Sequence, residues 1–387
     1  MVREAAINLY LAITGLIFNI CRVFPVQKKT VMIASFGDNI QYVLDEVHAR
    51  TSSKIVLLKD SKCNYTFRNA DDKNTIRFIP VNIPGTIRGI YHLATAEHVF
   101  VDNYQVVLAS CDFKKETTCV QLWHADGAVK LFGFKDKATT ERTASAQKRF
   151  KQVYSKFHKV VVSSDDMGWI FEEAFDLGDE NLLKTGMPRT DFFFNEAKMD
   201  RAMDKLHRQM PQLKDKQVIL YAPTFREGHL KVDEIRLNIK NLENSLSEDY
   251  HLLLRLHPAV KFDGKWDSEF VTDVSQGQDI FELLAVTDIL VTDYSSIPFE
   301  FSILGKPMIF YPYDLEEYKD TRGIWFDYET FVPGPVVYSS TEMIDIIKTE
   351  EYRLEKVLLF DETWNKYADG RATEKLVSTL YKDAAGR

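Results

Sequence analysis

With 387 residues, of which 45% are hydrophobic and 27% charged, the chain has room for two ordinary domains with substantial cores. Its net charge of −8 at pH 7 argues against a general nucleic-acid binder, because such proteins carry a basic surface. The cysteines are scattered, with no Cys-x-x-Cys pair and no histidine at metal spacing, so we expect reduced thiols in a cytoplasm. They are Cys21, Cys63, Cys111 and Cys119.

The first 28 residues differ from the rest of the chain. Ala5 to Cys21 carries no charge, and basic residues such as Arg3 and Arg22 flank it. We favour an amphipathic helix in the membrane interface, with its basic ends on anionic lipid. The alternatives are a helix buried against the first domain, a signal peptide and a full span. No convincing cleavage site follows, and a span usually needs about 20 apolar residues without this many polar ones.

A second basic feature lies between residues 130 and 159. Only two acidic residues, Asp136 and Glu141, occur in this segment. A solvated helix face is the commoner outcome for such a run, and a polyanionic substrate or a membrane surface is the alternative. The nine basic residues are Lys130, Lys135, Lys137, Arg142, Lys148, Arg149, Lys151, Lys156 and Lys159.

Strand-like and helix-like segments alternate along the chain, which predicts an α/β protein with parallel sheets covered by helices. The pattern restarts after residues 186–189, so we expect two Rossmann-like halves with a cleft between them. Expected strands are 30–34, 54–58, 76–81, 98–101, 118–122 and 160–163, then 217–222, 251–256, 270–274, 289–292 and 308–311. Expected helices include 40–49, 167–174, 196–210 and 297–304.

The segment Thr292-Asp293-Tyr294-Ser295-Ser296 ends one of these strands and precedes a helix-like stretch. Backbone N–H groups at a helix start, together with Ser and Thr hydroxyls, favour binding of an anion, most often phosphate. In open α/β sheets, ligands bind at that end of the strands. The simpler alternative is that Ser295 and Ser296 only cap the helix.

His124 follows another expected strand, in Trp123-His124-Ala125-Asp126-Gly127. Histidine can accept a proton at neutral pH, so His124 is a candidate general base. The alternative is a core histidine bonded to a backbone carbonyl. Asp126 either orients the ring or shapes the turn.

Other strand ends offer further polar groups. His257 follows 252–256 and suits phosphate binding or protonation of a leaving group, or else is part of a structural turn. Thr224 and Arg226 follow Pro223, and arginine binds phosphate oxygens through two N–H groups. Pro188 and Arg189 lie where the halves join, as a hinge alone or as a hinge that reaches the ligand.

Glu300, after Ser296, could accept hydrogen bonds from a ribose, or be a solvated or paired carboxylate. Asp-x-Asp and His-Glu-x-x-His patterns are absent from the sequence, so it demands no metal. The glycine patterns of dinucleotide and NTPase sites are also absent, and we expect no cofactor.

Taken together, these motifs resemble the CDP-glycerol glycerophosphotransferase family of wall teichoic acid synthesis. The resemblance extends from about residue 30 to 370. Asp126 departs from the pattern, in which Asn or another small residue is expected. The motifs are Gln121-Leu122-Trp123-His124, Gly186 to Asp191, Tyr221 to Arg226, Leu256-His257-Pro258, Thr292 to Ser296, and Gly323.

The resemblance implies a GT-B-like fold, with an acceptor domain at 29–187 and a CDP-glycerol-binding domain at 188–359. It also implies a C-terminal helix at 360–387 that returns to the first domain, and peripheral attachment of segment 1–28 to the cytoplasmic face of the cell membrane. The short length and the form of the His124 motif are most similar to the members that prime the polymer. These add one glycerol phosphate to an undecaprenyl-diphosphate-linked ManNAc-GlcNAc disaccharide and release CMP.

In this interpretation His124 is the general base, and His257, Arg226, Ser295 and Ser296 compensate charge on the donor without a metal. The basic residues, including Lys130, Lys135, Lys148 and Arg149, meet the lipid diphosphate or anionic headgroups. Other teichoic acid enzymes are possible partners. The alternatives are a polymerase that extends glycerol- or ribitol-phosphate chains, a GT-B glycosyltransferase using a nucleotide sugar, and a non-catalytic scaffold.

Overall fold

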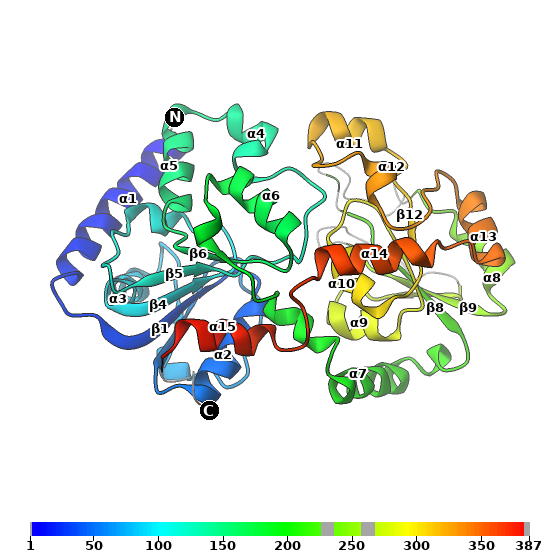
Figure 1. Cartoon of the computed structure of the whole chain (residues 1–387), viewed down its shortest axis with the longest axis horizontal. Coiled ribbons are helices and arrows are strands. Elements are labelled where there is room, and N and C mark those ends of the chain that lie inside the picture. The colour runs from blue at the N-terminus through cyan, green and yellow to red at the C-terminus, as the bar shows by residue number, and fades with distance from the viewer. Residues whose placement is uncertain (1, 225, 227–235, 257–267, 383–387) are drawn as a thin grey trace. The chain divides into compact units, whose positions relative to one another are not determined.

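The computed structural model describes residues 2–224, 226, 236–256 and 268–382. Contacts between Cα atoms divide the chain into two compact units, each with its own sheet (Figure 1). Unit 1 comprises residues 1–125, 132–191 and 367–387, and unit 2 comprises residues 126–131 and 192–366.

Unit 1 is built on a parallel sheet of seven strands in the order β3-β2-β1-β4-β5-β6-β7. The first six strands have the order that is typical of dinucleotide-binding folds. The strands are β1 (Gln27–Ala34), β2 (Lys54–Lys59), β3 (Thr75–Arg77), β4 (Ala96–Val101), β5 (Thr118–Gln121), β6 (Lys159–Val161) and β7 (Leu182–Leu183).

Helices cover this sheet, and α2 and α15 pack together on one face (Figure 1). Alternate residues of β1, such as Met32 and Ala34, join a core with Val43 of α2 and Leu376 of α15, because successive strand residues point to opposite faces. The helices of unit 1 are α1 (Val2–Cys21), α2 (Asp38–Arg50), α3 (Ile83–Ala94), α4 (Lys137–Thr140), α5 (Ala144–Tyr154), α6 (Asp165–Phe175) and α15 (Ala372–Leu380).

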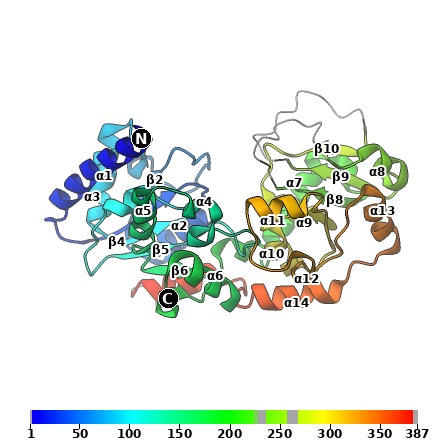
Figure 2. The same cartoon turned by 90° about the horizontal axis from the view of Figure 1, so that it is seen from above.

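The N-terminal helix α1 lies against unit 1, beside α3 and α5 (Figure 2). The carboxylate of Glu4 accepts hydrogen bonds from both terminal nitrogens of Arg149, at 3.1 and 3.2 Å. The hydroxyls of Thr14 and Ser110 share a hydrogen bond of 3.0 Å. Only Thr14 and Phe18 of the helix are buried. The helix is long and apolar enough to cross a membrane, but signal sequences and buried helices have the same properties.

Unit 2 contains a parallel sheet of five strands in the order β10-β9-β8-β11-β12. One face packs on α8 and α13, through Ile219, Leu242 and Met343 among others. The strands are β8 (Gln217–Tyr221), β9 (Tyr250–Leu254), β10 (Val271–Asp273), β11 (Ile289–Thr292) and β12 (Met308–Phe310). The helices are α7 (Glu196–Gln209), α8 (Ile239–Leu246), α9 (Ile280–Val286), α10 (Ile297–Phe301), α11 (Leu315–Thr321), α12 (Tyr328–Phe331), α13 (Ser340–Thr349) and α14 (Leu354–Trp364).

Three boundaries differ from the sequence-based domains. The predicted C-terminal helix is two helices, α14 in unit 2 and α15 in unit 1. Residues 126–131 belong to unit 2, where Leu131 donates its N–H to Gly323 and Trp325 donates to Val129. Residues 188–191 belong to unit 1, because Asp191 accepts the N–H groups that begin α15. Each difference arises from contacts between segments that are distant in the sequence.

Candidate active site

Both sheets present polar residues at the carboxyl ends of their central strands. In a parallel sheet, the strand order reverses next to the first strand, and ligands bind outside the strand ends at that point. In unit 1 this point lies between β1 and β4, and in unit 2 between β8 and β11. His124 lies just beyond β5, beside the first point, and Asp293 lies at the second.

The chain turns sharply at the end of β5. Trp123 has a φ of 60°, in the left-handed region that L residues rarely adopt. Its N–H donates to Oε1 of Gln121 at 2.8 Å, and its carbonyl accepts from Nδ2 of the buried Asn39 at 3.1 Å. A strained backbone held by such contacts often marks a functional site. The turn fixes the position of the next residue, His124.

The imidazole of His124 is half-buried and oriented from two sides. Its Nδ1 lies 3.1 Å from the backbone oxygen of Asp102. Because a carbonyl can only accept, we assign the proton of the neutral ring to Nδ1, which makes Nε2 the basic nitrogen. The bond to a carbonyl is the one expected of a structural histidine, but the partial exposure at a strand end is compatible with a general base.

Asp102, which the sequence analysis missed, organises the loop after β1. Its carboxylate accepts the N–H groups of Ser35, Phe36 and Gly37 at 2.8, 3.0 and 2.8 Å. Burial raises the pKa of Asp102 to about 6, although these hydrogen bonds act in the opposite direction. Its position directly after β4 was the available signal, because polar residues that follow parallel strands lie at the edge of the sheet where ligands bind.

Asp126, predicted to orient His124 or to shape the turn, is fully buried and belongs to unit 2. Next to it, Gly127 packs against Phe299, where an added Cβ would lie 2.1 Å from the ring. The segment 126–131 is thus held tightly within unit 2.

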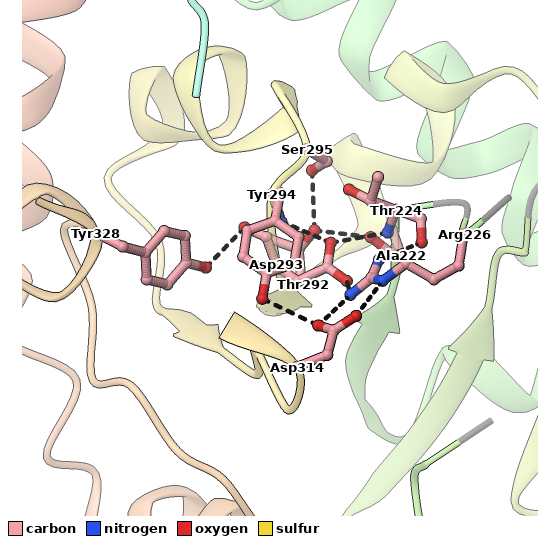
Figure 3. Close-up of polar contacts among 9 residues, drawn as sticks. All are labelled: Ala222, Thr224, Arg226, Thr292, Asp293, Tyr294, Ser295, Asp314 and Tyr328. Carbon is pink, nitrogen blue, oxygen red and sulfur yellow. Dashed lines mark hydrogen bonds and ion pairs between the residues drawn. The ribbon is translucent and has the colours of Figure 1, made fainter. Parts of the chain in front are cut away.

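Asp293 is the centre of a hydrogen-bonded cluster in unit 2 (Figure 3). Oδ1 of this buried carboxylate accepts the N–H of Thr224 at 2.8 Å and that of Tyr294 at 2.6 Å. Oδ2 lies 2.9 Å from the guanidinium of Arg226. The hydroxyl of Tyr328 donates to the backbone oxygen of Asp293 at 2.8 Å. The cluster joins the ends of β8 and β11.

Arg226, predicted to bind phosphate through two N–H groups, uses that geometry for Asp314 instead. Its Nε and a terminal nitrogen lie 2.6 and 2.9 Å from the two oxygens of Asp314, which also accepts the hydroxyl of Tyr294 (Figure 3). Burial opposes the charge of Arg226, but Asp314 and Asp293 outweigh it and raise the pKa of the guanidinium. Asp314 was missed, although it too follows a strand, β12.

The hydroxyls of the 292–296 segment are used within the protein. Thr292 donates to the backbone oxygen of Ala222 at 2.7 Å and shares a hydrogen bond of 2.8 Å with Ser295. Ser296 precedes α10, but its side chain makes no capping bond. Tyr294 and Glu300 are buried. The expected strand–turn–helix is therefore present, with a helix of five residues.

A polar cavity of about 670 Å³ lies beside this cluster in unit 2. Four tyrosines and three arginines contribute to its wall, which can contact both an aromatic ring and an anion. The lining residues are Arg226, Arg236, Tyr311, Tyr313, Asp314, Glu317, Tyr318, Thr321, Arg322 and Tyr338.

The remaining predicted residues have separate locations. His257 lies outside the described residues. Pro188 and Arg189 are buried in unit 1, and the N–H of Arg189 donates to Asn39 at 3.0 Å. In the described part of the chain, no three or more His, Cys, Asp or Glu side chains are grouped as metal ligands would be.

The four basic residues assigned to acceptor or membrane are divided between the two units and have different environments. Lys130 belongs to unit 2. Burial lowers the pKa of its ammonium group, and the positive charges of Arg322 and Arg226 lower it further, whereas the negative charge of Asp293 raises it. Lys135 pairs with Glu173 at 2.6 Å, and Lys148 is exposed on α5. Arg149 is buried and holds Glu4, which makes it a structural link to α1 rather than an exposed cation.

Residues 16–382 match the model of the family described as CDP-Glycerol:Poly(glycerophosphate) glycerophosphotransferase. The chain belongs to this family. Members of this glycerophosphotransferase family are transferases, and the chain is 35% identical to the teichoic acid glycerol-phosphate primase of Bacillus subtilis strain 168, over 98% of each chain. It is also 38% identical to the teichoic acid poly(ribitol-phosphate) polymerase of Bacillus spizizenii, over 75% of this chain and 47% of that one.

A solved structure of the wall teichoic acid polymerase TagF, a substituted variant soaked with CDPG, has the same fold. The TM-score is 0.81 at 23% identity, with 100% of this chain and 98% of the other covered. The predicted GT-B-like α/β fold with parallel sheets is thereby confirmed, as is the predicted glycerophosphotransferase family.

Proposed function

We propose that this enzyme transfers one glycerol phosphate from CDP-glycerol to undecaprenyl-diphosphate-linked N-acetylmannosaminyl-N-acetylglucosamine and releases CMP. The observation that carries the proposal is the match to a glycerol-phosphate primase along 98% of both chains. The match leaves no large segment of either chain without a counterpart. Membership of the glycerophosphotransferase family supports the reaction class.

In the proposed reaction, an acceptor hydroxyl attacks the β-phosphorus of CDP-glycerol. A new bond forms between the acceptor oxygen and this phosphorus, and the bond from the phosphorus to the oxygen of CMP breaks. Nε2 of His124 takes the hydroxyl proton, which the assigned proton on Nδ1 makes possible. CMP leaves as a phosphate and needs little protonation, so charge compensation on the donor matters more.

We assign CDP-glycerol to unit 2. The cluster around Asp293 and the adjoining tyrosine- and arginine-lined cavity lie at the position where such sheets bind ligands. Arg226 acts there mainly by ordering Asp293 and Asp314, while Arg236 and Arg322 add positive charge to the cavity. TagF, whose structure was obtained after a CDPG soak, supports this ligand class. His257, Thr224, Ser295, Ser296 and Glu300 remain proposed contacts.

We assign the acceptor to unit 1, which carries both His124 and α1. The exposed apolar side chains of α1 support peripheral attachment to the cytoplasmic face of the cell membrane, where a lipid-linked acceptor is available. Pro188 and Arg189, being buried in unit 1, contribute to its structure beside Asn39. Other teichoic acid enzymes are proposed as partners on the same surface.

Chain extension is the second candidate function. It is supported by the 38% identity to a ribitol-phosphate polymerase, which is higher than the identity to the primase but covers less of both chains. The two functions share donor chemistry and differ in the number of units that are added.

The test is CMP release from CDP-glycerol with the purified lipid-linked disaccharide, with products sized by mass spectrometry. We expect one added glycerol phosphate, and a rate lowered by about 10²–10⁴-fold in His124→Ala. His48→Ala, which removes an exposed histidine from the end of α2, is the matched control and should behave as wild type. Several added units would favour the polymerase, and turnover only with CDP-ribitol or a UDP-sugar would refute the proposed donor.

A further inference from the structure

The loop Ser35-Phe36-Gly37, after β1, has an unusual support. Three consecutive N–H groups point at one carboxylate, that of Asp102. Gly37 has a φ of 105°, and an added Cβ would lie 2.5 Å from Tyr65, so the loop has little freedom to change shape. Ser35 also donates its hydroxyl to Asp60, and Gln105 donates to both. The backbone of the loop is thus held from several sides.

The loop carries an aromatic side chain, that of Phe36, which is not part of the buried core of unit 1. Phe36 is 46% exposed, although the apolar residues of the preceding strand β1, from Val31 to Ala34, are buried. Its ring stacks on the imidazole of His124, with the centroids 4.3 Å apart and the planes inclined by 26°. The ring of Trp123 lies beside the same imidazole, and the centroids of these two rings are also 4.3 Å apart.

Asp102 therefore acts on His124 by two routes. Its backbone oxygen accepts from Nδ1 and sets the tautomer, while its carboxylate holds the loop that places Phe36 on the ring. We propose that Asp102 and Phe36 are positioning residues that hold His124 with Nε2 directed to accept the proton of the acceptor hydroxyl. This inference rests on the proposed role of His124 as the base.

A purely structural role explains the arrangement less well. A buried carboxylate is costly unless hydrogen bonds satisfy it, and here all three bonds that its oxygens accept from the main chain come from one loop. That loop contributes an exposed ring instead of a buried one. Misplacement of a reacting group by about 1 Å can lower the rate on the order of 10²-fold, so holding the imidazole of His124 in place would increase the rate of the reaction.

The experiment compares Phe36→Ala, Phe36→Tyr and Asp102→Asn in the full chain, with Asp71→Ala as the control. Asp71 also accepts a backbone N–H, from Lys73 at 2.9 Å, but it precedes β3 at the other end of the sheet. Initial rates give kcat and the KM for CDP-glycerol. The tautomer of His124 is followed by NMR of protein labelled with ¹⁵N-histidine, its signals being identified by their loss in His124→Ala.

We expect kcat to fall about 3- to 10-fold in Phe36→Ala, the factor that one aromatic contact carries, with KM for CDP-glycerol unchanged. Phe36→Tyr should restore the rate, because it restores the stack. Asp102→Asn should lower kcat further, on the order of 10²-fold, and broaden or shift the Nδ1–H signal. In the His124→Ala background, Phe36→Ala should have no additional effect.

Because Phe36 is half-exposed, its replacement leaves the core intact and keeps the proposal testable if Asp102→Asn does not fold. Wild-type kcat and an unchanged tautomer in Phe36→Ala would overturn the inference while leaving His124 as the base. Full activity in His124→Ala would instead overturn the base assignment. Equal rate losses in Phe36→Ala and Asp71→Ala would mean that both substitutions act by destabilising the fold, and this would also overturn the inference.

Discussion

Lys29 carries a positive charge into the interior of unit 1. Its side chain is 1% exposed and donates to Gln27 and Thr95, with the ammonium 5.1 Å from the ring of Tyr91. Burial, and secondarily the charge of Lys54, lowers the pKa of Lys29 from 10.5 to about 8. No function in the proposed reaction requires this charge.

Lys29→Met should therefore raise the free energy of unfolding at pH 7 by about 1–2 kcal/mol, after allowance for partial solvation. The folded-state pKa is below the unfolded one, so the unfolded chain binds more protons between about pH 8 and 10.5. The stability of the wild type should rise with pH in that window, and the advantage of the variant should shrink. Thermal unfolding at pH 7, 8.5 and 9.5 measures both, and an advantage that grows with pH would contradict the assignment.

For individual residues, the sequence was informative where a polar group follows a strand directly. His124, Thr224 and Asp293 were found by that rule, and their placement at the strand ends agrees with it. Their partners were not predictable, because Asp102 is 67 residues from Ser35 and Asp314 is 88 residues from Arg226. For the same reason, the ion pair that occupies Arg226 could not be anticipated.

The helix α1 has two different faces. Thr14 and Phe18 are buried, whereas four apolar residues at helical spacing remain 50–64% exposed. These are Leu9, Ile13, Leu16 and Ile20. The Glu4–Arg149 pair holds this helix to unit 1, and the apolar stripe on its exposed side is the basis of the proposed attachment to a membrane surface.

Replacing Leu9 and Leu16 with serine should weaken binding to vesicles containing phosphatidylglycerol by about 10²-fold or more, because each leucine that is buried in the membrane contributes about 1.5–3 kcal/mol. Cosedimentation at several lipid concentrations gives the partition coefficient. Leu358→Ser with Leu359→Ser is the matched control, since these side chains are 55% and 62% exposed on α14 of unit 2. Equal binding of wild type and the α1 variant would remove this helix as the anchor.

Helices and strands differed in how far the sequence predicted them. Short apolar runs located the strands to within a few residues, because buried parallel strands have few polar positions. Several helices were missed, among them α3 and α5, and the two-residue strand β7 was missed as well. In α3, a Pro and two glycines obscure the apolar periodicity, and in α5 the basic residues drew attention to charge although Arg149 is buried.

The two units each contain a complete core and sheet, yet the chain passes between them more than once. Residues 126–131 leave unit 1 directly after Ala125 and pair with residues 323–325 of unit 2. The chain therefore enters unit 2 two residues after His124, in a segment that is hydrogen-bonded within unit 2. Sequence patterns cannot reveal such a connection, because it depends on contacts nearly 200 residues apart along the chain.

If unit 2 binds the donor, CDP-glycerol should slow amide hydrogen exchange there first. At a ligand concentration of about 100 times Kd, binding stabilises the competent state by about 2.7 kcal/mol, or about 100-fold in the exchange of amides that open locally. We expect the strongest protection in peptides covering 290–300 and 311–322, which contain Asp293 and Asp314. Peptides covering β2 and β3, away from both strand-order reversals, provide the internal control.

UDP-GlcNAc at the same concentration tests the nucleotide, and Asp314→Asn tests the cluster. This variant loses one partner of Arg226 and of Tyr294, so a higher CDP-glycerol concentration should be needed for equal protection. Protection confined to unit 1 would contradict the assignment of the donor. Equal protection by UDP-GlcNAc would show that the cavity recognises the parts common to both ligands, the ribose and the diphosphate among them, rather than the groups that distinguish cytosine from uracil or glycerol from the sugar.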